Sequence, residues 1–331
     1  TGVQTCALPI FTSVRQSGPT RPSGRAVRRM RRLTSVMAAR LPQDAAADRH
    51  RGRLPSTSVR PDPATLVDLE RYPVDTPDAP AAVEAIAGAR ADLARQVVAV
   101  IPGFLRPSAI AAMVAEADRL AVGRHHQDLM GSPYLEVPAD DWPADHPRRS
   151  QGRSALTAIP YDAFPDDSPL RALYEWEPLL EFVRRALDRS ALHRYADPLG
   201  ALNVAAMYDG DELAWHFDQT DFVVSIALQR PETGGEFECA PFTRTADVER
   251  YDVVARCLDG APDAPTTVLD FEPGTLMLFE GRNSLHRVTP IGGPVPRHVA
   301  LLGYDTRPDV HSRSEEHTSE LQSHSFISYA V

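Results

Sequence analysis

Trp215-His216-Phe217-Asp218 and a distant segment that begins at His286 hold the residues whose types and spacing are best suited to metal chemistry. Residues two apart in an extended strand point to the same face, so His216 and Asp218 can direct an imidazole and a carboxylate at one point. His286, arriving on a neighbouring strand, would add a second imidazole. The sequence therefore predicts a metal centre whose ligands are His216, Asp218 and His286.

A histidine and an aspartate two residues apart form a weak motif by themselves, because short motifs match by chance. The structural alternative makes His216 a strand-end histidine and Asp218 a turn former. Three neighbouring features favour the metal. A strand ends at residues 208–210 just before the motif, His286 follows a turn and a short strand, and Arg297 opens a strongly apolar strand. Two histidines and one carboxylate, with the opposite coordination positions open, are the ligand set of non-haem Fe(II) oxygenases.

The second half of the chain has the pattern of short strands that can position such ligands. Apolar residues there recur with a period of two, and Gly, Pro and Asp separate the segments. The predicted strands cover residues 201–208, 221–229, 235–240, 266–272, 275–280, 284–290 and 297–304, with one helical insert at 247–258. Regular short strands of this kind are typical of a sandwich or barrel.

The first half is expected to supply helices. Helical spacing predicts helices at residues 80–98, 108–122 and 178–189, with Ser108 as the N-cap of the second, and a short strand at 96–101. The polar, proline-rich segment 123–170 is predicted to be a long loop or lid. We therefore expect an α+β, mainly β fold with a double-stranded β-helix (jelly roll, cupin-like) core and flanking N-terminal helices.

Three parts of the chain differ in composition. Residues 1–63 are rich in Arg, Ser, Pro and Ala, and both ends resemble translated sequencing-adapter sequence. His311, His317 and His324 are therefore excluded as ligands. The expected organisation is a disordered or artefactual leader at 1–63, a catalytic domain at 64–310 and a disordered or artefactual tail at 311–331.

Charge and cysteine content limit the classes of partner. The net charge is −10, and residues 1–60 carry a balance of +10, so the remainder carries −20. An acidic body argues against nucleic acid as a partner, because phosphate contacts need a basic face. Three cysteines without paired spacing favour a reducing cytoplasm, and no apolar run approaches a membrane span. A small-molecule substrate is expected, whereas the sequence leaves the oligomeric state open.

The segments 215–238 and 273–290 resemble the Fe(II)/2-oxoglutarate-dependent oxygenases, and the resemblance extends over residues 69–308. The most similar group contains the hydroxylases and radical halogenases that act on free amino acids, notably lysine. The resemblance implies Fe(II), 2-oxoglutarate and O₂ as cofactors and cosubstrates.

Carried over residue by residue, the resemblance makes His216, Asp218 and His286 the iron ligands. It makes Arg297 the clamp for the far carboxylate of 2-oxoglutarate, since a guanidinium binds a carboxylate bidentately. Asn203 and Tyr208 match positions that often face the cosubstrate, although both could equally be core or turn residues.

Asp218 distinguishes between two chemistries within this group. In the halogenases a small residue replaces the carboxylate ligand and opens a site for chloride, so Asp218 predicts hydroxylation of a small molecule, such as free lysine. Asp221, Glu236 and Glu238 are candidates to meet a substrate ammonium group, with solvent-facing strand ends as the alternative. Many relatives carry Ser or Thr two residues after the arginine, where this chain has Val299.

The sequence is also compatible with three other functions. A peptidyl hydroxylase of the prolyl type would need an open groove and act on peptides. A non-catalytic jelly-roll protein would bind metal without consuming 2-oxoglutarate. A nucleic-acid demethylase is supported only by the arginine-rich leader and opposed by the acidic body.

Overall fold

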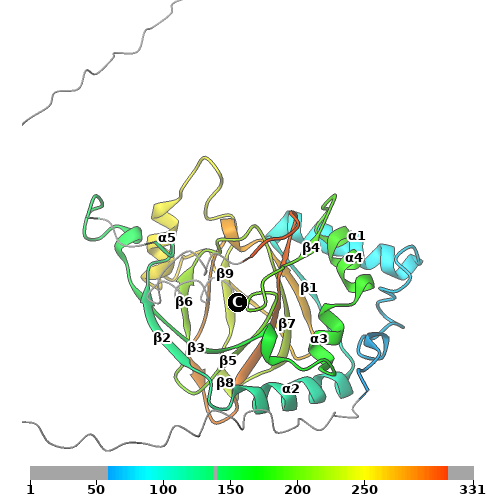
Figure 1. Cartoon of the computed structure of the whole chain (residues 1–331). Helices are drawn as coiled ribbons and strands as arrows, with labels where there is room; N and C mark the ends of the chain where they lie inside the picture. Colours follow the sequence, from blue (N-terminus) through cyan, green and yellow to red (C-terminus); the bar gives the residue numbers. More distant parts are fainter. Residues whose placement is uncertain (1–58, 137–139, 312–331) are drawn as a thin grey trace, which may run out of the picture. The chain divides into compact units, whose positions relative to one another are not determined.

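The computed structural model describes residues 59–136 and 140–311 (Figure 1). Division of the chain by contacts separates Thr1–Ser56 from Thr57–Val331, and the described residues belong to the second unit. Most of the predicted leader and nearly all of the predicted tail, including His317 and His324, lie outside the described residues. The first element is a short 3-10 helix at Pro63–Thr65.

Most of the strands form one antiparallel sheet in the order β1-β11-β7-β14-β5-β3-β6-β12-β9-β10, with β2 beside β3. The period-two pattern of the second half produces most of them, as predicted. Their bounds are β1 Val98–Ile101, β2 His126–Gly131, β3 Gly152–Pro160, β5 Leu202–Met207, β6 Leu213–His216, β7 Val223–Gln229, β9 Phe237–Ala240, β10 Thr267–Leu269, β11 Leu276–Phe279, β12 Leu285–Val288 and β14 Arg297–Leu302. Two small pairs, β8 Thr233–Gly234 with β13 Ile291–Gly292 and β4 His193–Arg194 with β15 Tyr304–Asp305, lie outside this sheet.

The sheet curls so that strands from distant places in its order face each other. Phe237 on β9 and Phe279 on β11 meet edge to face at 5.2 Å between ring centroids, although many strands separate them in the order. Side chains from β5, β6, β7, β12 and β14 complete the same interior cluster. A mainly β fold with an antiparallel sheet and few helices is therefore confirmed, whereas the double-stranded β-helix assignment stays a prediction.

Four helices cover the outer face of β7, β11 and β14, and Figure 1 shows α1, α3 and α4 on the side of β1 and β7 and α2 along the bottom of the view. Outward residues such as Ile226, Leu278 and Ala300 pack against these helices. The fifth helix lies near β6 and packs with Trp215 and Phe217. The bounds are α1 Pro80–Gln96, α2 Pro107–Ala121, α3 Pro169–Tyr174, α4 Glu177–Ala186 and α5 Tyr251–Leu258.

The expectation of a long loop over residues 123–170 was wrong. This segment contains β2 and the nine-residue strand β3, which pairs with β5, β6 and β2. Four consecutive residues of β3 are buried, so the strand lacks the alternation that marks a half-buried strand. Ser108 is also not the N-cap of α2. Arg106 holds that position without a side-chain cap, and Pro107 begins the helix.

None of the helices in the described part of the chain combines the length and the apolar character that a membrane crossing requires.

Phe104→Ala is expected to lower the free energy of unfolding by about 3–5 kcal/mol, because it leaves a cavity between the sheet and the helices. Phe104 is fully buried, and its ring lies 5.9 Å from that of Tyr72 and 6.1 Å from that of Phe182. Urea denaturation measures the change. Val83→Ala on the exposed side of α1 is the control and should change stability by less than about 0.5 kcal/mol.

Candidate metal centre

The pairing of two strands brings the three predicted ligands together. β6 ends at His216, which lies directly opposite His286 on the antiparallel strand β12, and the two ring centroids are 4.2 Å apart. Asp218 follows two residues beyond the end of β6, and its Oδ1 lies 3.5 Å from Nε2 of His286. One ligand atom from each of the three residues lies within 4.8 Å of the others, and all three side chains are buried.

Each histidine is oriented by the backbone carbonyl two residues earlier in the chain. Nδ1 of His216 lies 2.8 Å from the carbonyl oxygen of Ala214, and Nδ1 of His286 lies 2.8 Å from that of Ser284. A carbonyl oxygen can only accept, so both Nδ1 atoms carry the proton and donate it. Nε2 of each ring is therefore left with a free lone pair, which is the form that ligates a metal.

The atoms that face one another in this site have no hydrogen-bond partner among the described residues. They are Nε2 of His216, Nε2 of His286 and both carboxylate oxygens of Asp218. Buried polar groups are almost always hydrogen-bonded, because an unsatisfied one costs about 1–3 kcal/mol. Four such acceptor atoms converging on one point fit a divalent cation.

Burial and charge keep the His216 imidazole in the ligating form. Burial, followed by the neighbouring His286, lowers the pKa of His216 to about 4. The ring is thus neutral at pH 7 and offers its lone pair.

Two aromatic rings hold His286 in place. Phe237 stacks on it at 5.6 Å, and Phe279 meets it edge to face at 4.8 Å. Both phenylalanines belong to the interior cluster of the sheet. The imidazole therefore has little freedom to rotate away from the ligand position.

Gly281 leaves the space that the Asp218 carboxylate occupies. A Cβ atom at Gly281 would lie 1.7 Å from Oδ2 of Asp218. The backbone carbonyl of Gly281 also accepts a hydrogen bond of 3.2 Å from the Asp218 amide. No sequence pattern pointed to Gly281, because the contact joins segments far apart in the chain.

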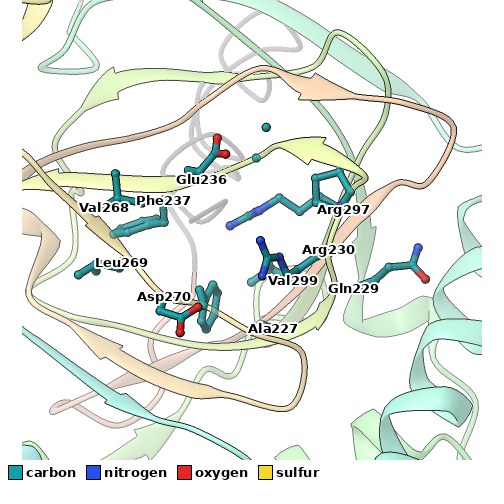
Figure 2. Close-up of a pocket in the computed structure, with 14 residues that line it drawn as sticks. Ala227, Gln229, Arg230, Glu236, Phe237, Val268, Leu269, Asp270, Arg297 and Val299 are labelled. Carbon is teal, nitrogen blue, oxygen red and sulfur yellow. The ribbon is translucent and has the colours of Figure 1, made fainter.

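Arg297 lies at the start of β14, and its guanidinium points into a cavity of about 240 Å³ (Figure 2). The side chain is 4% exposed, and no acidic group in the described part of the chain forms an ion pair with it. Burial lowers the pKa of Arg297 to about 10, so the group remains a cation at pH 7. Phe237 lines the same cavity and stacks on His286, so its ring contacts both the Arg297 cavity and the candidate ligand His286.

Three more buried polar atoms without hydrogen-bond partners lie on or beside the strands β5, β7 and β11. Asn203 on β5 is opposite Leu301, whose side chain is in the interior cluster, so Asn203 faces the interior too. Its Oδ1 and the hydroxyls of Ser225 on β7 and Thr275 before β11 are buried without a hydrogen-bond partner among the residues described. The amide of Ala227, which lines the Arg297 cavity, bonds to the Thr275 carbonyl.

The structure does not bring every predicted site residue to the Arg297 cavity. Asn203 lines a different, smaller cavity together with Thr220. Tyr208 is 38% exposed, and its ring packs edge-on against His126. The assignment of Asn203 and Tyr208 to the cosubstrate stays a prediction.

A larger cavity of about 730 Å³ opens beside the metal centre. It is lined by Asp218 and by aromatic and charged side chains from several loops, among them Tyr134, Glu136, Asp221, Arg244, Arg282 and Arg307. Arg244 was not singled out in the sequence, because it lies in the connection between β9 and α5.

The three acidic residues considered for a substrate ammonium all have partners. Asp221 pairs with Arg282, Glu238 pairs with Arg287, and Glu236 accepts from the hydroxyl of Thr289. Only Asp221 lines the larger cavity. Glu236 lines the Arg297 cavity instead.

The model of the family described as Halogenase D matches residues 145–323, which is more than half of the chain. The chain belongs to this family, and the protein is an enzyme. None of the curated proteins matches the chain.

Solved structures resemble the chain at low identity. An oxidoreductase of the 2OG-Fe(II) oxygenase family from Burkholderia pseudomallei is 15% identical over 67% of this chain and 91% of its own, with a TM-score of 0.44. AviO1 from Streptomyces viridochromogenes is 20% identical over 68% and 95%, with a TM-score of 0.45. EctD from S. alaskensis, solved with 2-oxoglutarate and 5-hydroxyectoine, is 20% identical over 69% and 77%, with a TM-score of 0.43. These TM-scores are below 0.5, which is too low to support a conclusion about function. The function is therefore inferred from the residues of this chain.

Gly281→Ala is expected to weaken metal binding about 10–100-fold, the range typical of changes to groups that orient ligands, because the new methyl group displaces the Asp218 carboxylate. Anaerobic calorimetric titration with Fe(II) measures this. Gly88→Ala on α1, where a Cβ would meet open space, is the matched control and should bind Fe(II) with wild-type affinity. Unchanged affinity in Gly281→Ala would mean that Asp218 does not ligate from its observed position.

The metal-free protein is expected to lose stability as the pH falls from about 6.5 towards 4. The folded state keeps His216 neutral down to a pKa of about 4, whereas the unfolded chain takes up the proton near 6.5. Within that window the unfolded state binds more protons, so acidification favours unfolding. Urea denaturation across this range should show a flatter pH dependence for His216→Gln, and exposed His125→Gln should behave as the wild type.

Proposed function

We propose that the protein is an Fe(II)- and 2-oxoglutarate-dependent dioxygenase that hydroxylates a small molecule, with a free amino acid such as lysine as the substrate class. One observation carries this proposal. Two Nε2 lone pairs and a carboxylate converge in a buried site without partners among the described residues, on one side of a point that a metal would occupy. This ligand set is typical of non-haem iron oxygenases.

The chain's own residues would hold both the metal and the cosubstrate. His216, Asp218 and His286 would ligate the iron, and Arg297 would bind the far carboxylate of 2-oxoglutarate in its cavity. When bound, iron, 2-oxoglutarate and O₂ would supply the oxidation: 2-oxoglutarate would give succinate and CO₂, with one oxygen atom of O₂ going to succinate and the other to the substrate. A buried cation without an acidic partner gains much from a carboxylate, because the guanidinium is already removed from water in the folded protein. The hydroxyls of Ser225 and Thr275 are candidates for the second donor that Val299 cannot supply.

Hydroxylation fits the site better than the halogenation in the family's printed name. A halogenase site of the type that the sequence resembles has a small residue where Asp218 stands. Here a carboxylate points at Nε2 of His286, and Gly281 provides the room for it. The third protein ligand therefore takes the position that a halide would need.

The remaining parts of the proposal follow from the same features. A double-stranded β-helix core fits the curled sheet, whose two ends meet around one interior cluster. A small substrate, rather than nucleic acid or a membrane, suits the cavity of about 730 Å³ beside Asp218. A cytoplasmic location is supported by Cys239 and Cys257, which are both buried and unpaired. A prolyl-type hydroxylase remains the alternative and would act on peptides.

Anaerobic titration of the protein with Fe(II) and 2-oxoglutarate is expected to produce the visible charge-transfer band of a chelated keto acid. Admission of O₂ should then release succinate, and a screen of free amino acids should identify the one that stimulates release and gains oxygen. Asp218→Ala should abolish hydroxylation, because it removes one of three protein ligands.

Arg297→Gln should raise the 2-oxoglutarate concentration needed for the band by at least about tenfold, the loss expected for a charge-assisted pair. Arg230→Gln is the matched control, since Arg230 lines the same cavity but is more than half exposed and paired with Glu272. Absence of the band in the wild type would remove the oxygenase proposal. A chlorinated product in place of an alcohol would overturn the choice of hydroxylation.

A further inference from the structure

The arginines that line the larger cavity differ in how closely the described acidic groups pair with them. Arg282 lies 2.5 Å from Asp221, and Arg307 lies 3.2 Å from Asp305. The acidic group nearest to Arg244 is Glu249 at 3.7 Å, beyond hydrogen-bond distance. Glu249 lies equally far from Arg148, which also pairs with Glu136, so Arg244 has only this one loose ion pair among the described residues.

The position of Arg244 is fixed next to the metal centre. Its guanidinium lies over the ring of Phe217 at 4.1 Å, and Phe217 stands between the ligands His216 and Asp218 in the chain. Its Nε donates a hydrogen bond of 2.6 Å to the carbonyl of Arg282. The terminal nitrogens have no hydrogen-bond acceptor in the ranges that the structure describes. The side chain is only 18% exposed, and burial lowers the pKa of Arg244.

Two hydroxyl groups lining the same cavity also lack partners within the described ranges. They belong to Tyr134, which is 6% exposed, and to Thr220, two residues after Asp218. Burial raises the pKa of Tyr134, so its hydroxyl stays protonated and can donate a hydrogen bond. A fixed cation and two unused hydroxyls are the groups that recognise a planar anion.

We propose that Arg244 binds the carboxylate of the substrate, assisted by the hydroxyl of Tyr134. This inference rests on the proposed function and deepens it, because it restricts the substrate to molecules that carry a carboxylate. The anion would lie beside Phe217, so the rest of the substrate would extend along the cavity wall towards Asp218. Arg244 would then be a specificity-determining residue separate from Arg297, which lines a different cavity.

The test compares L-lysine with L-lysinamide, in which a neutral amide replaces the carboxylate. Binding is measured by calorimetry with the iron- and 2-oxoglutarate-loaded protein under anaerobic conditions. We expect the wild type to bind lysine at least about tenfold more tightly than lysinamide. Arg244→Gln should remove this preference by weakening lysine about tenfold, with little change for lysinamide or for the 2-oxoglutarate band. Tyr134→Phe should weaken lysine by about threefold, as expected for one neutral hydrogen bond.

Arg307→Gln is the matched control. It removes a positive charge from the same cavity, but Arg307 is 76% exposed and paired with Asp305, so the preference for lysine should remain. Arg244→Lys restores a cation and should recover part of the preference.

Several results would overturn the assignment. The wild type could bind lysine and lysinamide equally, or Arg244→Gln could keep the preference for lysine. Either result would show that Arg244 does not bind the carboxylate. A loss of 2-oxoglutarate affinity in Arg244→Gln would assign the residue to the cosubstrate instead. A wild type that forms the band but binds none of the free amino acids would reject the carboxylate assignment and leave the iron chemistry standing. A wild type without the band would overturn the proposed function and this inference together.

Discussion

The antiparallel register between β6 and β12 is the constraint on which the site depends. It places His216 directly opposite His286, and the hydrogen bond from each Nδ1 to the carbonyl two residues earlier turns both Nε2 atoms towards the same point. A shift of one residue in this register would move one imidazole to the other face of the sheet. The ligand pair is thus set by the backbone, and Asp218 completes it from the loop that follows.

The two faces of the sheet serve different purposes. Outward residues such as Ile226 and Leu278 pack against helices α1 to α4 and provide stability. Inward positions combine apolar residues with groups that lack hydrogen-bond partners in the described structure, including Asn203 and Ser225. Unsatisfied buried polar groups destabilise a fold, so their concentration on the inner face is a structural sign of ligand binding. Phe237 joins the two parts of this interior, because its ring contacts both His286 and the Arg297 cavity.

The candidate metal centre has two separate cavities nearby, and the charged groups that line them differ. The cavity at Arg297 contains a buried cation without an acidic partner in the described chain, which suits a dicarboxylate. The cavity at Asp218 is larger and contains several ion pairs, and Arg244 there has only a loose pair with Glu249 at 3.7 Å. Under the proposed function, separate cavities would allow a cosubstrate and a substrate to be recognised by different arginines.

The sequence by itself determined the three ligand candidates and the strand-rich second half. Both the spacing of His216 and Asp218 and the period-two pattern from residue 201 onward are local properties of the sequence. They can be recognised without knowledge of the tertiary contacts. The sequence also predicted Arg297, since an arginine opening an apolar strand is unusual, and the structure buries it.

The tertiary structure alone decided which residues support the site. Gly281 makes room for a carboxylate more than sixty residues away, and Arg244 reaches Phe217 from a connecting loop. Strand β3 was missed because burial on both faces removes the alternation by which a strand is recognised. These contacts join segments distant in the chain, so they arise only when the sheet curls and brings the segments together.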